Sequence, residues 1–125
     1  MAAEPSARLR FPRSRRLKQR SDFARAKAQG QRIVCGCLIA NYLIKPQGDS
    51  TRLGVITSRK VGQAVARSRA RRLLRESFRL HQLEIERPVD LVLVARPSIA
   101  GKKFAEVERD FLKALTQARL LKQAE

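Results

Sequence analysis

The chain has 125 residues, enough for one domain whose hydrophobic core needs no disulfide or metal to hold it. Its 28 Lys and Arg residues outnumber its 11 Asp and Glu residues, so the formal net charge is +17. The apolar runs are too short to span a bilayer, and the Arg-rich N-terminal stretch lacks the apolar segment of a secretory signal. The composition argues against a membrane protein and favours a protein that binds a polyanion such as nucleic acid.

The positive charge is concentrated in two segments. Residues 8–32 contain ten Lys and Arg against Asp22, and residues 52–79 contain nine against Glu76. From residue 84 onward, eight basic residues are balanced by seven acidic ones. A surface that served solubility would mix both signs. The two basic segments are therefore predicted to bind nucleic acid, and the C-terminal third is predicted to be scaffold.

Residues 1–15 are predicted to form a flexible basic arm, followed by an RNA-binding α+β domain over residues 16–122. A short first helix is expected to begin with Ser21 or Asp22 as its N-cap and to end at Gly30.

Two stretches rich in β-branched and aliphatic residues, 32–45 and 52–58, are predicted to be strands. Gly36 marks either a bulge or a break that divides the first stretch into two strands. A turn at residues 46–50 joins the stretches, so an antiparallel meander is expected.

Cys35 and Cys37 are the two cysteines of the chain. In a strand, residues i and i+2 share a face, so both thiols are expected on one side of the sheet. A lone Cys-Gly-Cys lacks the further ligands of a zinc site. Buried reduced thiols are the preferred interpretation, and they indicate a reducing cytoplasm.

A long helix is predicted over residues 63–82, with five arginines in the nine residues 67–75. At about 100° per residue, its basic and apolar residues fall on different arcs. The basic arc contains Arg67, Arg71, Arg72, Arg75 and Arg79. The other arc contains Ala66, Ala70, Leu73, Leu74, Ser77, Leu80 and His81. Because a guanidinium is always charged and forks onto phosphate oxygens, this helix is expected to bury one face and bind a polyanion with the other.

Residues 89–95 are almost continuously apolar, which is typical of a strand covered on both faces. A final amphipathic helix is predicted from the helical spacing of Phe104, Val107, Phe111, Leu115 and Ala118. The expected order is α-β-β-β-α-β-α, and the helix between the third and fourth strands suggests a β-α-β crossover. The predicted fold class is α+β, a single domain with one mixed four-stranded sheet and helices packed on it.

No catalytic site is predicted. His81 is the single histidine and is expected to be a half-buried packing residue. Carboxylates in the basic segments stand alone, whereas a two-metal nuclease needs a cluster of them. Glu106, Glu108 and Asp110 are expected on a solvated helix face. Since no Gly-rich phosphate loop occurs either, the chain is predicted to be a binder.

RNA is favoured over duplex DNA as the ligand. A helix-turn-helix reader is disfavoured because a strand precedes the arginine helix. A face made almost wholly of arginine favours phosphate contacts and recognition of shape. Phe23 and Tyr42 are the candidates for stacking on bases, with a core anchor as the equal alternative for Phe23.

Residues 58–76 read SRKVGQAVARSRARRLLRE and resemble the signature of the bacterial ribonuclease P protein component, K-K-x-G-N-A-V-x-R-N-R-x-K-R-x-x-R-E. Upstream, Arg16-Leu17 and Ser21-Asp22-Phe23 are similar to the N-terminal element of that family, and residues 89–97 resemble its last strand. The similarity runs in order over residues 16–120.

The resemblance implies a left-handed β-α-β crossover, against the usual right-handed rule, as in a domain of a small-subunit ribosomal protein. It also implies the protein subunit of ribonuclease P, which binds the catalytic RNA and the 5′ leader of precursor tRNA and assists endonucleolytic removal of the leader. The chemistry then belongs to the RNA, which holds most of the Mg²⁺. The expected partners are these two RNAs in the cytoplasm, with no membrane and no required protein partner.

The resemblance further implies two binding sites and no catalytic or metal-binding residue in the protein. The residues that bind the catalytic RNA are Arg59, Lys60, Arg67, Ser68, Arg69, Arg71, Arg72 and Arg75. The leader-binding cleft, between the first helix and the sheet, contains Phe23, Lys27, Ile39, Asn41 and Tyr42.

The chain departs from the family pattern at several positions. Gln63 and Ser68 stand where the family has asparagine, and Lys27 and Asn41 stand where aromatic residues are common. Weaker stacking on the leader and more reliance on charge are therefore expected.

The sequence leaves two alternative functions open. A structural ribosomal-type RNA-binding protein would have the same composition. A self-contained nuclease is the third alternative, and the inventory of catalytic groups argues against it.

Overall fold

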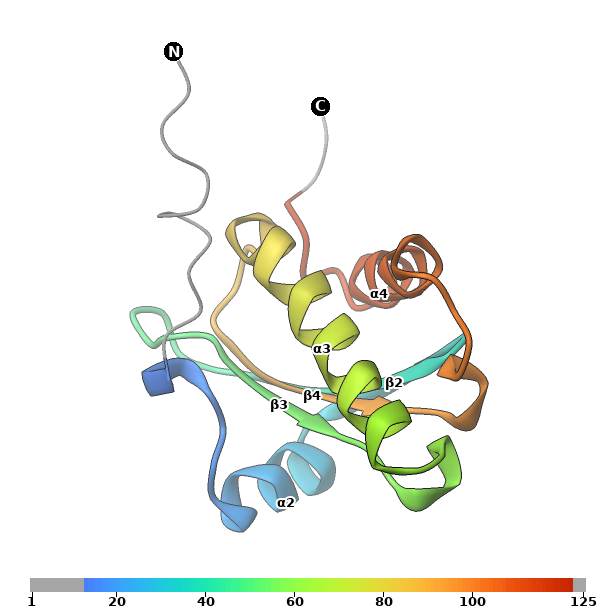
Figure 1. Ribbon diagram of the computed structural model, residues 1–125. Coiled ribbons are helices and arrows are strands. Elements are labelled where there is room, and N and C mark those ends of the chain that lie inside the picture. Colours follow the sequence, from blue (N-terminus) through green and yellow to red (C-terminus); the bar gives the residue numbers. More distant parts are fainter. Residues whose placement is uncertain (1–12, 123–125) are drawn as a thin grey trace.

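The fold is described over residues 13–122 by a computed structural model, in which a four-stranded sheet separates α2 from α3 and α4 (Figure 1). The strands are β1 (Gln31–Cys35), β2 (Leu38–Ile44), β3 (Arg52–Ile56) and β4 (Val89–Ala95). The helices are α2 (Arg20–Gln29), α3 (Ala64–His81) and α4 (Phe104–Gln117). This confirms the predicted α+β class and the order α-β-β-β-α-β-α. Most of the predicted basic arm, residues 1–12, lies outside the described residues.

The strand order in the sheet is β1-β2-β4-β3. β1 and β2 form an antiparallel hairpin that turns at Gly36, whose φ is +57°. β4 pairs antiparallel with β2 and parallel with β3. The expected meander is therefore wrong, because β4 lies between β2 and β3. The apolar β4 takes a central position since both of its faces are covered. The β3-α3-β4 crossover is present as predicted, and its left hand stays a prediction.

The larger core lies between the sheet and the two helices α3 and α4. Alternate residues of β4 point into it, and Phe78 of α3 and Phe111 of α4 are fully buried there. Burial of such a side chain stabilises the fold by about 2–3 kcal/mol. The predicted apolar arc of α3 is confirmed for Ala70, Leu73, Leu74 and Ser77, which are buried. Its other members, Ala66, Leu80 and His81, are half-buried, and the buried Phe78 was not predicted to lie on this arc.

The smaller core lies under α2, on the other face of the sheet. Ala26 of α2 packs with Leu17 and Val92, and Phe23 lies against them. A Cβ at Gly54 would come within 2.4 Å of the Phe23 ring, so glycine is needed for this approach. Phe23 is thus a core anchor of α2, with part of its ring exposed.

α2 ends at Gly30 as predicted, but its N-cap is Gln19, which makes no side-chain capping bond. Neither Ser21 nor Asp22 caps the helix. The Asp22 carboxylate instead lies 3.5 Å from Arg25 and 3.4 Å from Arg52. Asp22, which the sequence pattern predicted as a possible N-cap, therefore forms ion pairs instead of capping the helix.

Asp90 is a buried carboxylate at the centre of this ion-pair cluster. Its oxygens accept hydrogen bonds from Arg52 Nε at 3.0 Å, Arg52 Nη2 at 2.8 Å and Lys45 Nζ at 3.1 Å. Burial opposes ionisation, but the bonds from Arg52 and Lys45 outweigh it and lower the pKa of Asp90. The cluster joins β2, β3 and β4 at one end of the sheet.

We expect Asp90→Asn to lower the free energy of unfolding by about 2–4 kcal/mol, because two cations lose a buried counter-charge. Urea denaturation at about pH 7 measures this. Because the folded pKa is lowered, the stabilisation is complete above the ordinary aspartate pKa of about 3.9 and is lost as the pH falls through the folded value. Asp49→Asn, at an exposed turn, is the control and should change stability by less than about 0.5 kcal/mol. Equal stability of the two variants would contradict the assignment.

Candidate nucleic-acid interface

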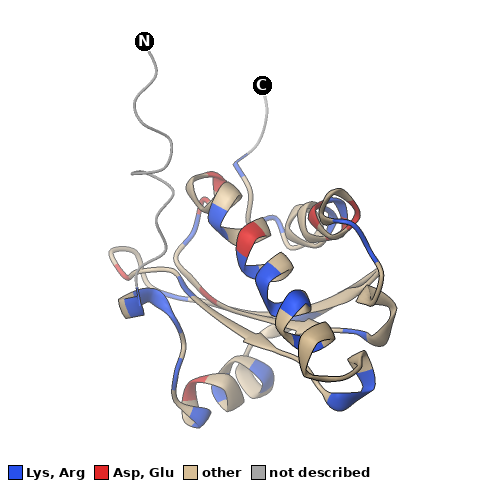
Figure 2. Ribbon diagram, in the orientation of Figure 1, with Lys and Arg blue, Asp and Glu red and all other residues tan. Residues whose placement is uncertain are grey.

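α3 presents the predicted basic face on the surface of the protein. Figure 2 shows Lys and Arg along this helix and in the segment that leads to α2. Arg72 and Arg75 are exposed, whereas Arg67, Arg69 and Arg71 are half-buried. Arg59 and Lys60 are exposed in a short 3-10 turn just before α3, which the buried Val61 anchors.

The arginines of α3 differ in what they contact. Arg69 Nη2 donates to the carbonyl oxygen of Lys102 at 2.6 Å, so this side chain braces the loop before α4. Arg79 Nε donates to Glu76 at 3.0 Å. The side chains of Arg72 and Arg75 make no hydrogen bond or ion pair with any residue in the 13–122 range. Of the arginines predicted to face RNA, Arg69 therefore has a structural contact, and Arg72 and Arg75 are available to a ligand.

Like charges converge where α3 meets the segment before α2. One hollow is lined by Arg16, Arg72, Arg75, Glu76 and Arg79, and the adjoining one by Arg13, Arg16, Lys18, Phe23 and Arg75 together with Leu17 and residues 53–55. Burial, then Arg16 and Arg71, lower the pKa of Arg75. Arginine stays protonated regardless, so this crowding costs free energy that a bound anion would relieve.

Sequence reasoning left Arg13, Arg16 and Lys18 out of the site. The backbone brings them there, because Leu17 N–H donates to the Leu53 carbonyl at 2.8 Å and ties the segment to the outer side of β3. The excess of basic residues in the segment 8–32 was the sequence signal that could have indicated these three residues.

A row of apolar residues crosses all four strands on the face that carries α2. Strand register places Val34, Ile39, Val94 and Ile56 side by side. Val34 is 45% exposed and the other three are half-buried, so α2 leaves this row partly open. Lys27, one turn after Phe23 on α2, is exposed. Phe23 and Lys27 of α2 and Ile39 of β2 thus lie on the same side of the sheet, and their part in a leader cleft stays a prediction.

Asn41 and Tyr42 do not join this row. Asn41 faces α2 but is 3% exposed, in the neighbouring row that α2 covers. Tyr42 packs in the larger core, on the opposite face of the sheet, because successive strand residues alternate in direction. Assigning Tyr42 to the cleft is therefore wrong. Val34, Ile56 and Val94 belong to this row but were not predicted as site residues. The alternation of side chains along a strand could have placed them on the α2 face once the strand register was known.

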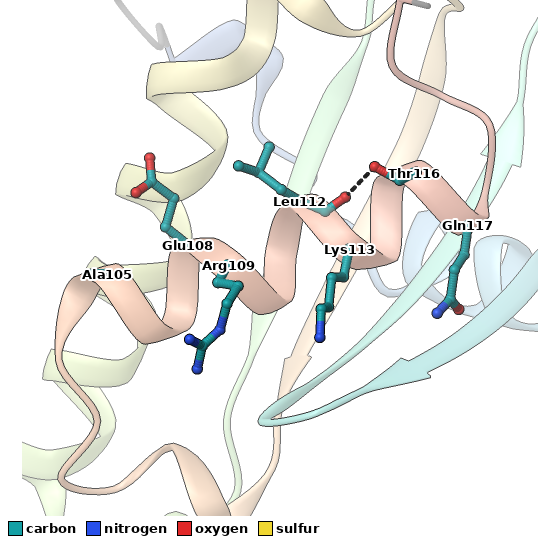
Figure 3. A pocket seen from close by; sticks show the side chains of 7 residues that line it. All are labelled: Ala105, Glu108, Arg109, Leu112, Lys113, Thr116 and Gln117. Atoms are coloured by element: carbon teal, nitrogen blue, oxygen red, sulfur yellow. Dashed lines mark hydrogen bonds between the residues drawn. The ribbon is translucent and has the colours of Figure 1, made fainter.

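A separate hollow lies on the outer side of α4 (Figure 3). Arg109, Lys113 and Gln117 project to one side of the helix, and Glu108 and Leu112 to the other. Thr116 donates its hydroxyl to the Leu112 carbonyl at 2.7 Å. These residues offer no nucleophile paired with a base, so the hollow has no catalytic assignment.

His81 connects the C-terminal end of α3 to the N-terminal half of α4 rather than only packing. Its Nε2 lies 2.7 Å from Glu108 and its Nδ1 lies 2.8 Å from Glu84, both through carboxylate oxygens. Burial opposes protonation, but the hydrogen bonds to Glu108 and Glu84 outweigh it and raise the pKa of His81.

The acidic residues of α4 make structural contacts as well, and Glu108 and Asp110 are half-buried rather than fully solvated as expected. Glu106 caps the N-terminus of α4 by accepting from Lys103 N–H at 2.9 Å. Asp110 accepts from Cys37 N–H at 3.0 Å. Within residues 13–122, no three His, Cys, Asp or Glu side chains come together as metal ligands.

Cys35 and Cys37 are buried free thiols, as predicted. The strand expected to carry both is interrupted by the left-handed Gly36 between them, where a Cβ would meet the Asp110 carboxylate. Burial and the neighbouring Asp110 raise the pKa of Cys37 to about 12, and burial raises that of Cys35. Neither thiol is a reactive thiolate at neutral pH.

An α+β domain with an arginine face, and with His81 and the carboxylates of α4 engaged in structural contacts, has the features of an RNA-binding protein. The family model described as ribonuclease P matches residues 11–119. The chain therefore belongs to the ribonuclease P protein family, the protein components of a ribonucleoprotein endoribonuclease of tRNA processing.

Relatives in two bacteria support this membership. The ribonuclease P protein component of Gluconacetobacter diazotrophicus is 37% identical over 109 residues, covering 85% of this chain and 92% of that protein. That of Clostridium acetobutylicum is 31% identical over 110 residues, covering 85% and 90%.

Solved structures agree with the fold. The ribonuclease P protein of Staphylococcus aureus matches with a TM-score of 0.78 at 25% identity, covering 86% of this chain and 98% of that chain. The Thermotoga maritima protein matches with a TM-score of 0.73 at 26% identity, covering 82% and 96%. In the part of the chain that the structure describes, no helix is long and apolar enough to cross a membrane.

We expect the stability of the chain to fall, relative to His81→Gln, as the pH rises from about 5 to about 9. A histidine with a raised folded pKa contributes its full stabilisation below its ordinary pKa of about 6.5 and loses it as the pH rises through the folded value. Thermal melts of both proteins across this range test it. A constant difference between them would show that His81 does not titrate against Glu84 and Glu108.

Proposed function

We propose that the chain binds the catalytic RNA of ribonuclease P through the arginine face of α3 and the segment 13–18. The observation that carries this is the convergence of Arg16, Arg72 and Arg75 around adjoining hollows, with Arg72 and Arg75 unpaired among the described residues. Guanidinium groups in such a cluster suit the closely spaced phosphates of a folded RNA.

The 5′ leader of precursor tRNA is proposed to lie along the apolar row beside α2. Ile39, Val94 and Ile56 offer apolar contact to unstacked bases, and Lys27 offers charge for a phosphate. The half-buried Phe23 lines the hollow at the β3 end. The row reaches all four strands, which is long enough for several nucleotides of single strand. Because α2 covers Asn41, contact between this row and the leader depends on aliphatic side chains and charge.

Hydrolysis of the leader bond is proposed to take place in the RNA, and Mg²⁺ to be held mainly there. The protein assists by neutralising phosphates and by holding the leader near the cleavage site. His81, Glu106, Glu108 and Asp110 have structural partners in the fold, and none of these four is proposed to act as a general base.

We expect the protein to increase leader cleavage by the catalytic RNA at Mg²⁺ concentrations too low for the RNA to act well unaided. Cleavage of labelled precursor tRNA measures this, with protein freed of RNA as a control that should cleave nothing. No gain over the RNA would overturn the proposal. Recovery of the chain with ribosomal subunits would favour the structural ribosomal-type alternative.

Replacing Arg72 and Arg75 by Ala should weaken binding to the catalytic RNA by about tenfold to a hundredfold. With about 5 phosphate contacts, the slope of log affinity against log salt should be near −3 to −4, and the double variant should flatten it by about 1.4. The control removes two cations of α4, by Arg109→Ala with Lys113→Ala, and should leave the slope unchanged. Equal slopes in the two variants would show that the α3 face does not contact RNA.

A further inference from the structure

Arg71 differs from its neighbours on α3 because both ends of its guanidinium are held by hydroxyl groups. Nη1 donates to Thr57 Oγ1 at 2.8 Å, and Nη2 donates to Ser68 Oγ at 3.2 Å. Thr57 directly follows β3, and Ser68 lies one turn earlier on α3. The fork therefore spans from the helix to the end of a strand, which fixes the plane of the guanidinium.

Two of these residues depart from the family signature together. The pattern has asparagine at the position of Ser68 and lysine at the position of Arg71. A lysine ammonium is a point donor on a flexible stem, whereas a guanidinium is a planar fork that two acceptors can orient. Ser68 thus supplies an acceptor to the arginine that has replaced lysine, and Thr57 supplies the second.

The held guanidinium belongs to a residue one helical turn before Arg75, which lines both basic hollows. Burial, then Arg16 and Arg71, lower the pKa of Arg75. The positive charges of Arg71 and Arg75, both on α3, are therefore close in space. Thr57 and Ser68 accept from the Nη atoms, and the remaining N–H groups of Arg71 stay available as donors. A phosphate bound there would meet a side chain that is already ordered.

We propose that Thr57 and Ser68 are positioning residues that hold Arg71 in the orientation in which it binds a phosphate of the catalytic RNA. This inference rests on the proposed function of the arginine face. A fixed side chain loses less rotamer freedom on binding than a free one, so the two hydroxyls raise RNA affinity by orienting Arg71.

Affinity of the full chain for the catalytic RNA tests the inference. Thr57→Val keeps the shape and removes the acceptor, and should weaken binding by about threefold to tenfold. Thr57→Ser restores the hydroxyl and should bind as the unchanged protein does. Ser68→Ala should weaken binding less, and combined with Thr57→Val should approach Arg71→Ala. Thr116→Val, which removes a hydroxyl from α4, is the matched control and should have no effect.

A double-mutant cycle separates positioning from a general structural effect. In an Arg71→Ala background, Thr57→Val should cause no further loss of affinity. An equal loss in both backgrounds, or full affinity of Thr57→Val, would overturn the inference. Should Arg72→Ala with Arg75→Ala weaken binding while Thr57→Val does not, the inference fails and the proposed RNA face stands. Should neither variant weaken binding, the proposed function fails as well.

Discussion

Burial of one face of α3 against the sheet is the interaction on which the rest of the structure depends. Six arginines share this helix with one carboxylate, Glu76. Like charges at i, i+4 oppose the helix by about 0.2–0.5 kcal/mol per pair, whereas each of Leu73, Leu74 and Phe78 contributes about 2 kcal/mol or more when buried. Packing therefore prevails over repulsion, and the apolar face keeps the arginines on a rigid surface.

Elements with a strong local period could be predicted closely from the sequence. The long helix expected at 63–82 is Ala64–His81, and the strand expected at 89–95 is Val89–Ala95. Strand neighbours could not be predicted in this way. β3 follows β2 in the chain yet pairs with β4, because the choice of partner depends on which strand has two covered faces. That information lies in packing across the whole domain.

The residue types of the candidate site could be predicted from the sequence, but not which arginines contact the rest of the fold and which remain available to a ligand. Helical spacing placed most of the arginines on one face, but the partner of Arg69 and one of the two partners of Arg71 come from elsewhere in the chain. The carbonyl of Lys102 takes Arg69, and the hydroxyl of Thr57 takes Arg71. Glu108, expected in solvent, meets His81 from another helix. Each contact joins residues that no local pattern relates, so the structure is needed to separate arginines that brace the fold from those that remain available to a ligand.

The backbone bond between Leu17 and Leu53 has a consequence for how copies of the protein meet. β3 is an outer strand of the sheet, and an uncovered outer strand offers N–H and C=O groups on which the sheet of another molecule can continue. The segment around Arg16 and Leu17 occupies part of that border and adds positive charge to it. Sheet-to-sheet polymerisation is thereby discouraged on this side, and the same segment that lines the basic hollows helps to keep crowded molecules separate.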